Sequence, residues 1–198
     1  MRPAFVPFAA ILAAALACVS APARAFDWEL SCDRAWDLVK SNCEGARDAW
    51  HGEDYDVYLF GHVHHGRSTY TAEHLKTLNE RAWGTGIGKR HVDENDHTHI
   101  IYAVAFADSH FKAEYMAGYG WLTHWRPLGD AGPRPGLGFV AFVTLRSDYS
   151  HYLAPVPGLL PAAEVAWGRA SLMATYVPRL SSKGGNGDVL MLFGRISF

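Results

Sequence analysis

Segments of alternating polarity fill the sequence from Asp54 to the C-terminus and restrict the folds open to it. In each segment, side chains of one kind recur at every second position, which is the period of a β-strand. Stretches rich in Gly, Pro, Asn and Asp, such as DAGPRPG and SSKGGNG, separate many of the segments, as turns do. Eight candidate strands result, at residues 55–65, 82–92, 98–108, 112–125, 136–145, 155–166, 169–177 and 188–198.

The length and number of these strands point to a membrane setting. After residue 25 no apolar run approaches the length of a membrane-spanning helix, yet 13% of the residues are aromatic. A chain that crosses a bilayer without helices must close its strands into a barrel, because only closure pairs every backbone group. Eight strands of about ten residues are what the smallest such barrels need. We predict an all-β fold, an eight-stranded antiparallel transmembrane β-barrel; the alternative is a soluble domain that ends on a strand.

The last segment, GDVLMLFGRISF, carries the strongest topological signal. Its alternating apolar face ends on Phe198, and a terminal aromatic that closes such a strand resembles the sorting signal of bacterial outer-membrane proteins. The members of that face are Leu190, Leu192, Gly194, Ile196 and Phe198.

Other segments are apolar on both faces, which bears on what the barrel encloses. In residues 98–106 and 137–145, apolar side chains alternate with further apolar side chains. A water-filled channel needs polar side chains on its inner face, so we expect an apolar interior instead. Eight strands leave room for side chains or for one small ligand. A slot for an acyl chain and a barrel plugged by its own side chains both stay open.

The first 25 residues have the features of an export signal. Arg2 precedes an apolar stretch too short to span a membrane, and residues 23–25 (Ala-Arg-Ala) form a small-x-small cleavage site. We expect cleavage after Sec export and a single domain of 173 residues at 26–198. Without Arg2 and Arg24 that domain has 16 basic and 20 acidic residues, a net charge of −4, which argues against a nucleic-acid partner.

A helix is expected ahead of the first strand, over about residues 26–46. Apolar positions recur there at helical spacing and Gly45 is its expected end. A helix in a membrane interface and a helix that covers a core fit equally well. On one continuous helix Cys32 and Cys43 would be about 16 Å apart, too far to bridge. Either the helix breaks between them or they stay unpaired.

Two sites in the sequence carry reactive side chains. The stretch GHVHHG holds His62, His64 and His65; the last faces away from the other two on a strand, so we set aside a shared metal ion. Acyl transfer needs a hydroxyl or water and a base that accepts its proton. Ser109, His65 and Asp108 supply those residue types, provided that Asp108 and Ser109 lie at a turn, because neighbours on a strand face opposite ways.

The chain resembles the PagP-type lipid A acyltransferases of the bacterial outer membrane. The likeness spans about residues 26–198 and includes a final strand after TYVP. It rests on YDVYLFGHVHHGRSTY, NERAWGTGIG, YAVAFADSHFK, AGYGWLTHWRPL, GLGFVAFVTLR and LAPVPGLLP.

This resemblance implies a function and assigns residues to it. It implies a barrel preceded by an amphipathic helix that transfers a fatty acyl chain, usually palmitoyl, from a glycerophospholipid donor to lipid A. It places the functional histidine on His65, the Asp-Ser pair on Asp108 and Ser109, and the floor that measures the acyl chain on Gly120. It implies neither a metal ion nor an organic cofactor.

The chain departs from the family pattern at several positions. His74 stands where a lysine thought to recognise lipopolysaccharide often lies, so it is our candidate for that role. Phe60, Ala82 and Arg169 replace prolines thought to admit lipid sideways, while LAPVPGLLP keeps its prolines, which predicts one weakened seam between strands. Candidates for pairing with lipid A phosphates are Arg67, Lys76, Arg81, Lys89 and Arg90.

Two further classes of function stay open. A small barrel that binds or transports a hydrophobic ligand without chemistry is the main alternative to an acyltransferase, and an adhesion or structural barrel is the other. The expected partners of the acyltransferase are the phospholipid donor and lipid A, within the outer membrane. Monomer and homodimer are equally open.

Overall fold

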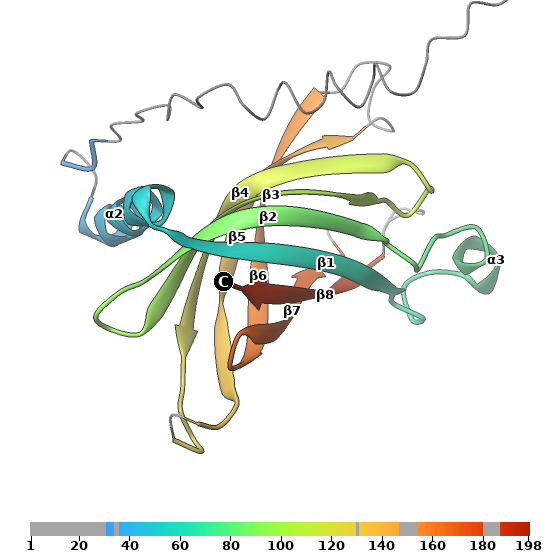
Figure 1. Cartoon of the computed structure of the whole chain (residues 1–198). Helices are drawn as coiled ribbons and strands as arrows, with labels where there is room; N and C mark the ends of the chain where they lie inside the picture. The colour runs from blue at the N-terminus through green and yellow to red at the C-terminus, as the bar shows by residue number, and fades with distance from the viewer. Residues whose placement is uncertain (1–30, 34–35, 130, 147–153, 180–186) are drawn as a thin grey trace, which may run out of the picture. The chain divides into compact units, whose positions relative to one another are not determined.

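A computed structural model describes residues 31–33, 36–129, 131–146, 154–179 and 187–198 (Figure 1). The expected signal peptide, residues 1–25, lies outside the described residues. Eight strands pair with their sequence neighbours, and the last pairs with the first, so that the sheet closes into an antiparallel barrel. The strands are β1 (Asp54–His65), β2 (Gly84–Val92), β3 (His97–Ala107), β4 (Ala113–His124), β5 (Arg134–Arg146), β6 (Ala154–Trp167), β7 (Ala170–Val177) and β8 (Val189–Ser197). The predicted barrel is confirmed.

The two ends of the barrel differ, and they are named here by residues of β1. The "Asp56 end" holds the start of β1, and the "His65 end" holds its last residue. Figure 1 shows helix α2 (Asp37–His51) next to the first of these ends and the short helix α3 (Ala72–Leu75) beyond the second. Among the described residues, no helix is long and apolar enough to cross a membrane.

The outer face of the barrel is apolar over its middle and aromatic towards its ends. Leu137, Leu159 and Leu172 stand more than half exposed on it, as a surface in contact with lipid requires. Exposed aromatic side chains lie near both ends of the strands, where the interfaces of a bilayer would be. Those near the His65 end are Trp83, Phe111, Tyr115 and Tyr176, and those near the Asp56 end are Tyr55, Trp125, Trp167 and Phe198.

Helix α2 lies eleven residues later than its expected start and passes through its expected end. Gly45 lies within the helix and does not end it. A glycine is needed there because a Cβ would lie 2.0 Å from Nδ1 of the buried His99 on β3. The Tyr119 hydroxyl of β4 donates to Asn42 Oδ1 at 3.0 Å, and Lys89 Nζ donates to the Trp50 carbonyl at 2.5 Å. The helix therefore packs against the outer wall of the barrel.

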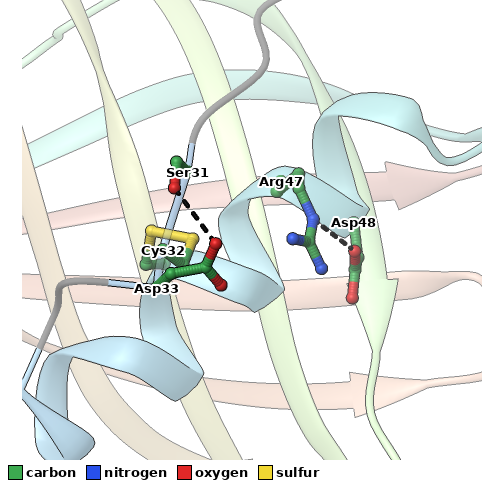
Figure 2. Close-up of a disulfide and its surroundings, with 6 residues drawn as sticks. Ser31, Cys32, Asp33, Arg47 and Asp48 are labelled. Atoms are coloured by element: carbon green, nitrogen blue, oxygen red, sulfur yellow. Dashed lines mark hydrogen bonds and ion pairs between the residues drawn. A yellow bond between two sulfur atoms is a disulfide. The ribbon is translucent and has the colours of Figure 1, made fainter.

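Cys32 and Cys43 are joined by a disulfide, with Cα atoms 5.8 Å apart (Figure 2). The bond is possible because Cys32 precedes α2, which begins at Asp37, so the two residues do not share one continuous helix. Of the two outcomes left open by the sequence, the structure has the broken helix and the bridge. The bond ties the segment ahead of α2 to the middle of the helix.

The barrel wall has a weakened seam between β6 and β7. Strand β6 pairs with β5 from Ala154 to Ala166, but among the described residues it pairs with β7 only from Ala162 to Trp167. The part of β6 without β7 partners carries Pro155, Pro157 and Pro161, and proline offers no N–H to a ladder. The predicted seam is confirmed, and it lies in the half of β6 nearer the His65 end.

The interior is apolar in its middle and charged at the Asp56 end. Tyr58, Ile100 and Leu122 are almost fully buried inside the barrel. Beyond them, Arg195 donates to Glu164 at 2.5 Å and to Asp56 at 3.5 Å. We call these side chains, together with His124, which lies 3.0 Å from Glu164, the "ion cluster". Its members are nearly inaccessible to solvent, so it ends the apolar part of the interior.

Candidate active site

His65 faces the interior because β1 contains a bulge. The pairing of β1 with β8 shifts register between Phe60 and His62, so that Gly61 has no partner on β8. Before the bulge even-numbered residues such as Phe60 are buried; after it Val63 and His65 are buried, and His62 is exposed. An extra residue reverses which side chains face in. Without the bulge, His64 would have the place of His65.

Ser109 lies in a tight turn between β3 and β4. The Asp108 carboxylate accepts hydrogen bonds from the backbone N–H groups of His110 and Lys112, both at 2.8 Å. On the other side, the N–H of Asn79 donates to the Ser109 carbonyl at 2.9 Å, and its side-chain amide donates to the Asp108 carbonyl at 3.0 Å. These bonds hold the turn at its base and fix where the serine hydroxyl stands.

The structure brings two of the three predicted catalytic residues into contact. Nε2 of His65 lies 2.9 Å from Oγ of Ser109, a hydrogen-bond distance across 44 residues of sequence. The Asp108 side chain does not join them, because its Oδ1 is engaged with the backbone of its own turn. The arrangement is a hydroxyl next to a base, which suits nucleophilic or general-base chemistry.

The third partner of this arrangement is Glu80, which sequence reasoning missed. Its Oε1 accepts the backbone N–H of His65 at 3.2 Å and lies 3.5 Å from Nδ1 of the same residue. Arg67 binds both carboxylate oxygens of Glu80 at 2.8 Å. The only sequence signal was its place in NERAWGTGIG, a motif of the family resemblance, because a carboxylate in a loop has no periodicity to mark it.

Arg67 governs the charge of Glu80. Its two hydrogen bonds lower the pKa of the Glu80 carboxyl from an ordinary 4.5 to about 2, and the His65 backbone N–H contributes in the same direction. Glu80 is therefore ionised throughout the pH range in which a histidine ordinarily titrates. His65 has a fixed negative charge beside Nδ1 and a hydroxyl at Nε2.

His74 is linked to the site through an aromatic contact. Its ring meets the ring of Tyr70 edge to face, and Tyr70 meets His65 in the same way, both with centroids 5.4 Å apart. His74 is part of helix α3, and the ring of Tyr70 lies between it and His65. His62 and His64 face away from the interior, and within the described residues no group of three or more His, Cys, Asp or Glu side chains could hold a metal ion.

A cavity of about 450 Å³ opens beside Ser109. Ser109 and Asp108 line it together with Phe106, Met116 and other apolar side chains of the interior. On its far side it is bordered by the proline-bearing half of β6, from Val156 to Leu160. The cavity therefore extends from Ser109 to the weakened seam in the wall.

A second, narrower cavity of about 30 Å³ lies deeper in the interior. It shares Met116, Phe142, Leu160 and Met191 with the first cavity, so the two follow one another along the barrel. Phe60 forms part of its wall, where it is stacked with Phe193 at a centroid distance of 4.8 Å. The interior thus offers one apolar path, and it narrows with depth.

Gly120 lies at the level of the deeper cavity. It pairs with Ile100 on β3 and with Val140 on β5, both of which line that cavity. A Cβ on Gly120 would lie 2.7 Å from Cγ1 of Ile100, so this isoleucine fills the space above the glycine. Any side chain at this position would push Ile100 into the narrow part of the path.

Two of the predicted phosphate-binding residues lie at the wrong end of the barrel. Lys89 donates to Trp50 of α2, and Arg90 forms ion pairs with Asp54 and Asp56. Strand β2 runs antiparallel to β1, so its last residues return to the start of β1, and the sequence order alone did not reveal this. Arg67 lies at the His65 end as expected, but Glu80 occupies its guanidinium.

Comparisons with known proteins point to one family. The family model described as "Antimicrobial peptide resistance and lipid A acylation protein PagP" matches residues 46–195. The lipid A acyltransferase PagP of Laribacter hongkongensis strain HLHK9 is 38% identical over 161 residues, 81% of this chain and 70% of that protein. That of Bordetella pertussis strain CS is 37% identical over 169 residues, 85% and 90% of the two chains.

A third relative shows a similar degree of likeness. The lipid A acyltransferase PagP of Legionella pneumophila serogroup 1 strain 2300/99 Alcoy is 38% identical over 167 residues, 84% of this chain and 86% of that protein. The residues matched by the family model include almost all of the barrel, the turn that holds Ser109 and the strand that ends on His65. The chain belongs to the PagP family.

Proposed function

We propose that this protein transfers a fatty acyl chain, palmitoyl in the first instance, from a glycerophospholipid to lipid A in the bacterial outer membrane. The observation that carries the proposal is the 2.9 Å contact between His65 Nε2 and Ser109 Oγ at the entrance to an apolar path. Lipid A acyltransferase is the activity in the names of the relatives. The family and the barrel both fit a bacterial outer-membrane protein.

The proposed chemistry is an ester exchange with His65 as the base. Nε2 takes the proton of the attacking hydroxyl as its oxygen bonds to the carbonyl carbon of the donor ester. The bond from that carbon to the glycerol oxygen then breaks, and the imidazolium returns the proton to the departing oxygen. The products are acylated lipid A and a lysophospholipid. In this direct route the attacking hydroxyl is that of lipid A, and Ser109 donates a hydrogen bond to the charged intermediate. In the alternative route Ser109 attacks first and forms an acyl-enzyme with release of the lysophospholipid; a lipid A hydroxyl, deprotonated by His65, then attacks that ester, and Ser109 leaves with the proton from the imidazolium.

The acyl chain of the donor is proposed to occupy the interior path. It enters at the seam between β6 and β7, where the described residues form no ladder pairs before Ala162 and where the wall borders the cavity beside Ser109. Its ester then lies at the His65 end and its tail points towards Gly120. Ile100 over Gly120 and the ion cluster below limit the depth, because a hydrocarbon tail gains nothing by entering a charged region.

Two further roles complete the proposal. Asp108 is a positioning residue, since its carboxylate shapes the turn that presents Ser109. His74 is proposed to contact the lipopolysaccharide acceptor, because it lies on the short helix beyond the His65 end. The protein is proposed to work without a cofactor, as a monomer or homodimer.

The test is label transfer by refolded protein in detergent or vesicles. Phosphatidylethanolamine with a labelled palmitoyl chain is the donor, and purified lipid A is the acceptor. The wild type is expected to move the label, and Ser109→Ala and His65→Ala are expected to lose that activity by about 10²-fold or more. Binding of labelled lipid without transfer in all three proteins would instead support a carrier, and it would overturn the enzymatic proposal.

A further inference from the structure

The Glu80 carboxylate lies beside the proposed base, His65, and has no role in the reaction steps proposed above. Glu80 approaches His65 from the side opposite Ser109: Oε1 is 3.5 Å from Nδ1, while Nε2 is 2.9 Å from the serine oxygen. The order hydroxyl, imidazole, carboxylate recurs in serine–histidine enzymes of several unrelated folds. Three residues from β1, the turn after β3 and the loop before β2 make it here.

The imidazole needs such a partner for a physical reason. Nε2 can accept a proton only in the tautomer whose hydrogen is on Nδ1, and this nitrogen is buried without a hydrogen bond in the structure. A carboxylate beside Nδ1 favours that tautomer and stabilises the imidazolium formed after proton transfer. The distance of 3.5 Å between Nδ1 of His65 and Oε1 of Glu80 is longer than a hydrogen bond, and such distances in active sites commonly shorten when substrate is bound.

Arg67 makes Glu80 suitable for this task. Its guanidinium holds both carboxylate oxygens, and it also donates to the His65 carbonyl at 3.3 Å. The His65 backbone N–H binds Glu80 Oε1 as well, so the carboxylate is fixed relative to the ring from two directions. These hydrogen bonds restrict the side-chain conformation of Glu80, whereas that of an unpaired glutamate in a loop would not be fixed.

Asp108 cannot take the same role in this geometry. Both of its hydrogen bonds go to N–H groups within its own turn, and the ring nitrogen that needs a partner is already opposite Glu80. We propose that Glu80, clamped by Arg67, is the positioning residue that orients His65 for proton transfer. This inference rests on the proposed acyl transfer.

The test compares Glu80→Gln with a matched ion pair elsewhere. Asp96 and Arg126, at the Asp56 end, form the same two-point contact at 2.8 and 2.9 Å. The acidic partners of the two pairs are equally exposed, at 27%. Asp96→Asn thus controls for the loss of a two-point ion pair as such.

Glu80→Gln is expected to lower kcat by about 10- to 100-fold with little change in KM, whereas Asp96→Asn leaves both unchanged. The acidic limb of the pH–rate profile should move to lower pH in Glu80→Gln, because the imidazolium loses a neighbouring negative charge. Arg67→Lys keeps the charge but loses the two-point grip, so an intermediate kcat is expected. Asp108→Asn keeps an acceptor for the turn and should leave the pH profile in place.

The outcomes separate this inference from the function beneath it. If the wild type transfers no label, the acyltransferase proposal fails first. If the wild type is active, His65→Ala is inactive and Glu80→Gln matches the wild type in kcat and pH profile, Glu80 merely anchors a loop and the inference is wrong. A shifted unfolding midpoint with unchanged kinetics would have the same meaning.

Discussion

At the scale of single residues, the site depends on where hydrogen-bonding atoms point. Ser109 and His65 were both predicted from their types, because a hydroxyl and an imidazole are what acyl transfer needs. Asp108 was predicted as their third member, but the structure turns its carboxylate to the backbone. Glu80 was not predicted, because its local sequence does not indicate that the loop before β2 places it next to His65 at the end of β1.

The ionisation of Glu80 gives a prediction for stability. Its pKa is about 2 in the folded protein and about 4.5 without its partners, so it stabilises the fold fully above pH 4.5. That contribution is lost as the pH falls towards 2. Unfolding in detergent at a series of pH values is expected to show Glu80→Gln less stable than the wild type at pH 6. The difference should disappear near pH 2, and an unchanged difference there would contradict the assigned cause.

Gly120 gives a prediction for selectivity. In Gly120→Met the new side chain displaces Ile100 into the narrow cavity, since Ile100 Cδ1 lies only 2.8 Å from the added Cβ. Competition between donors of different length should then show a shift to shorter acyl groups. Gly194→Met adds the same side chain on the outer face, where a Cβ has no neighbour nearer than 3.9 Å, and should leave selectivity unchanged. Equal selectivity in both variants would refute the ruler assignment.

At the scale of elements, periodicity predicted the strands well and the helix poorly. Each observed strand boundary lies within two residues of its predicted place, because alternating burial leaves a direct trace in the sequence. The end of the helix was predicted too early, because glycine commonly ends helices, whereas Gly45 allows the helix to approach His99 closely. The bulge at Gly61 was also missed, since a two-residue period does not show an inserted residue.

That bulge yields a prediction about an element. Deletion of Gly61 would place His62 directly after Phe60, so the pairing with Phe193 and Leu192 becomes continuous and His65 still faces the interior. The variant is expected to form a barrel, seen by strand-type circular dichroism, and to keep acyl transfer. Gly61→Ala is the control, because nothing lies within 4 Å of its Cβ, and it should keep wild-type activity. Loss of transfer by a folded deletion variant would contradict this account, because it would mean that the inward position of His65 needs the bulge itself.

At the scale of the whole molecule, the interior divides into a reactive entrance, an apolar path and a charged base. The apolar alternation predicted an apolar interior, but it did not say which face of each strand points inward; in the structure Ile100, Val104 and Val140 do. The ion cluster was not predicted, because its members come from four separate strands and each looks like an isolated polar residue in its own segment. Only closure of the barrel brings them together.

The cluster carries a prediction for global stability. Arg195 pairs with two carboxylates that have no access to water, so Arg195→Met removes the cation that they share and leaves, among the described residues, only Arg90 beside Asp56 and His124 beside Glu164. Breaking a buried pair in this way costs about 3–5 kcal/mol. Urea unfolding of the protein in vesicles should show that loss. A stability within about 1 kcal/mol of the wild type would mean that other cations satisfy the carboxylates.

The central claim is that this barrel moves one fatty chain from a phospholipid to lipid A through His65 and Ser109. Mass spectrometry of lipid A from cells that lack the protein, and from the same cells supplied with the wild type or Ser109→Ala, tests it directly. We predict an added mass equal to one fatty acyl group, palmitoyl in the first instance, with the wild type only. Lipid A of identical mass in all three strains, with the protein folded in the outer membrane, would contradict it.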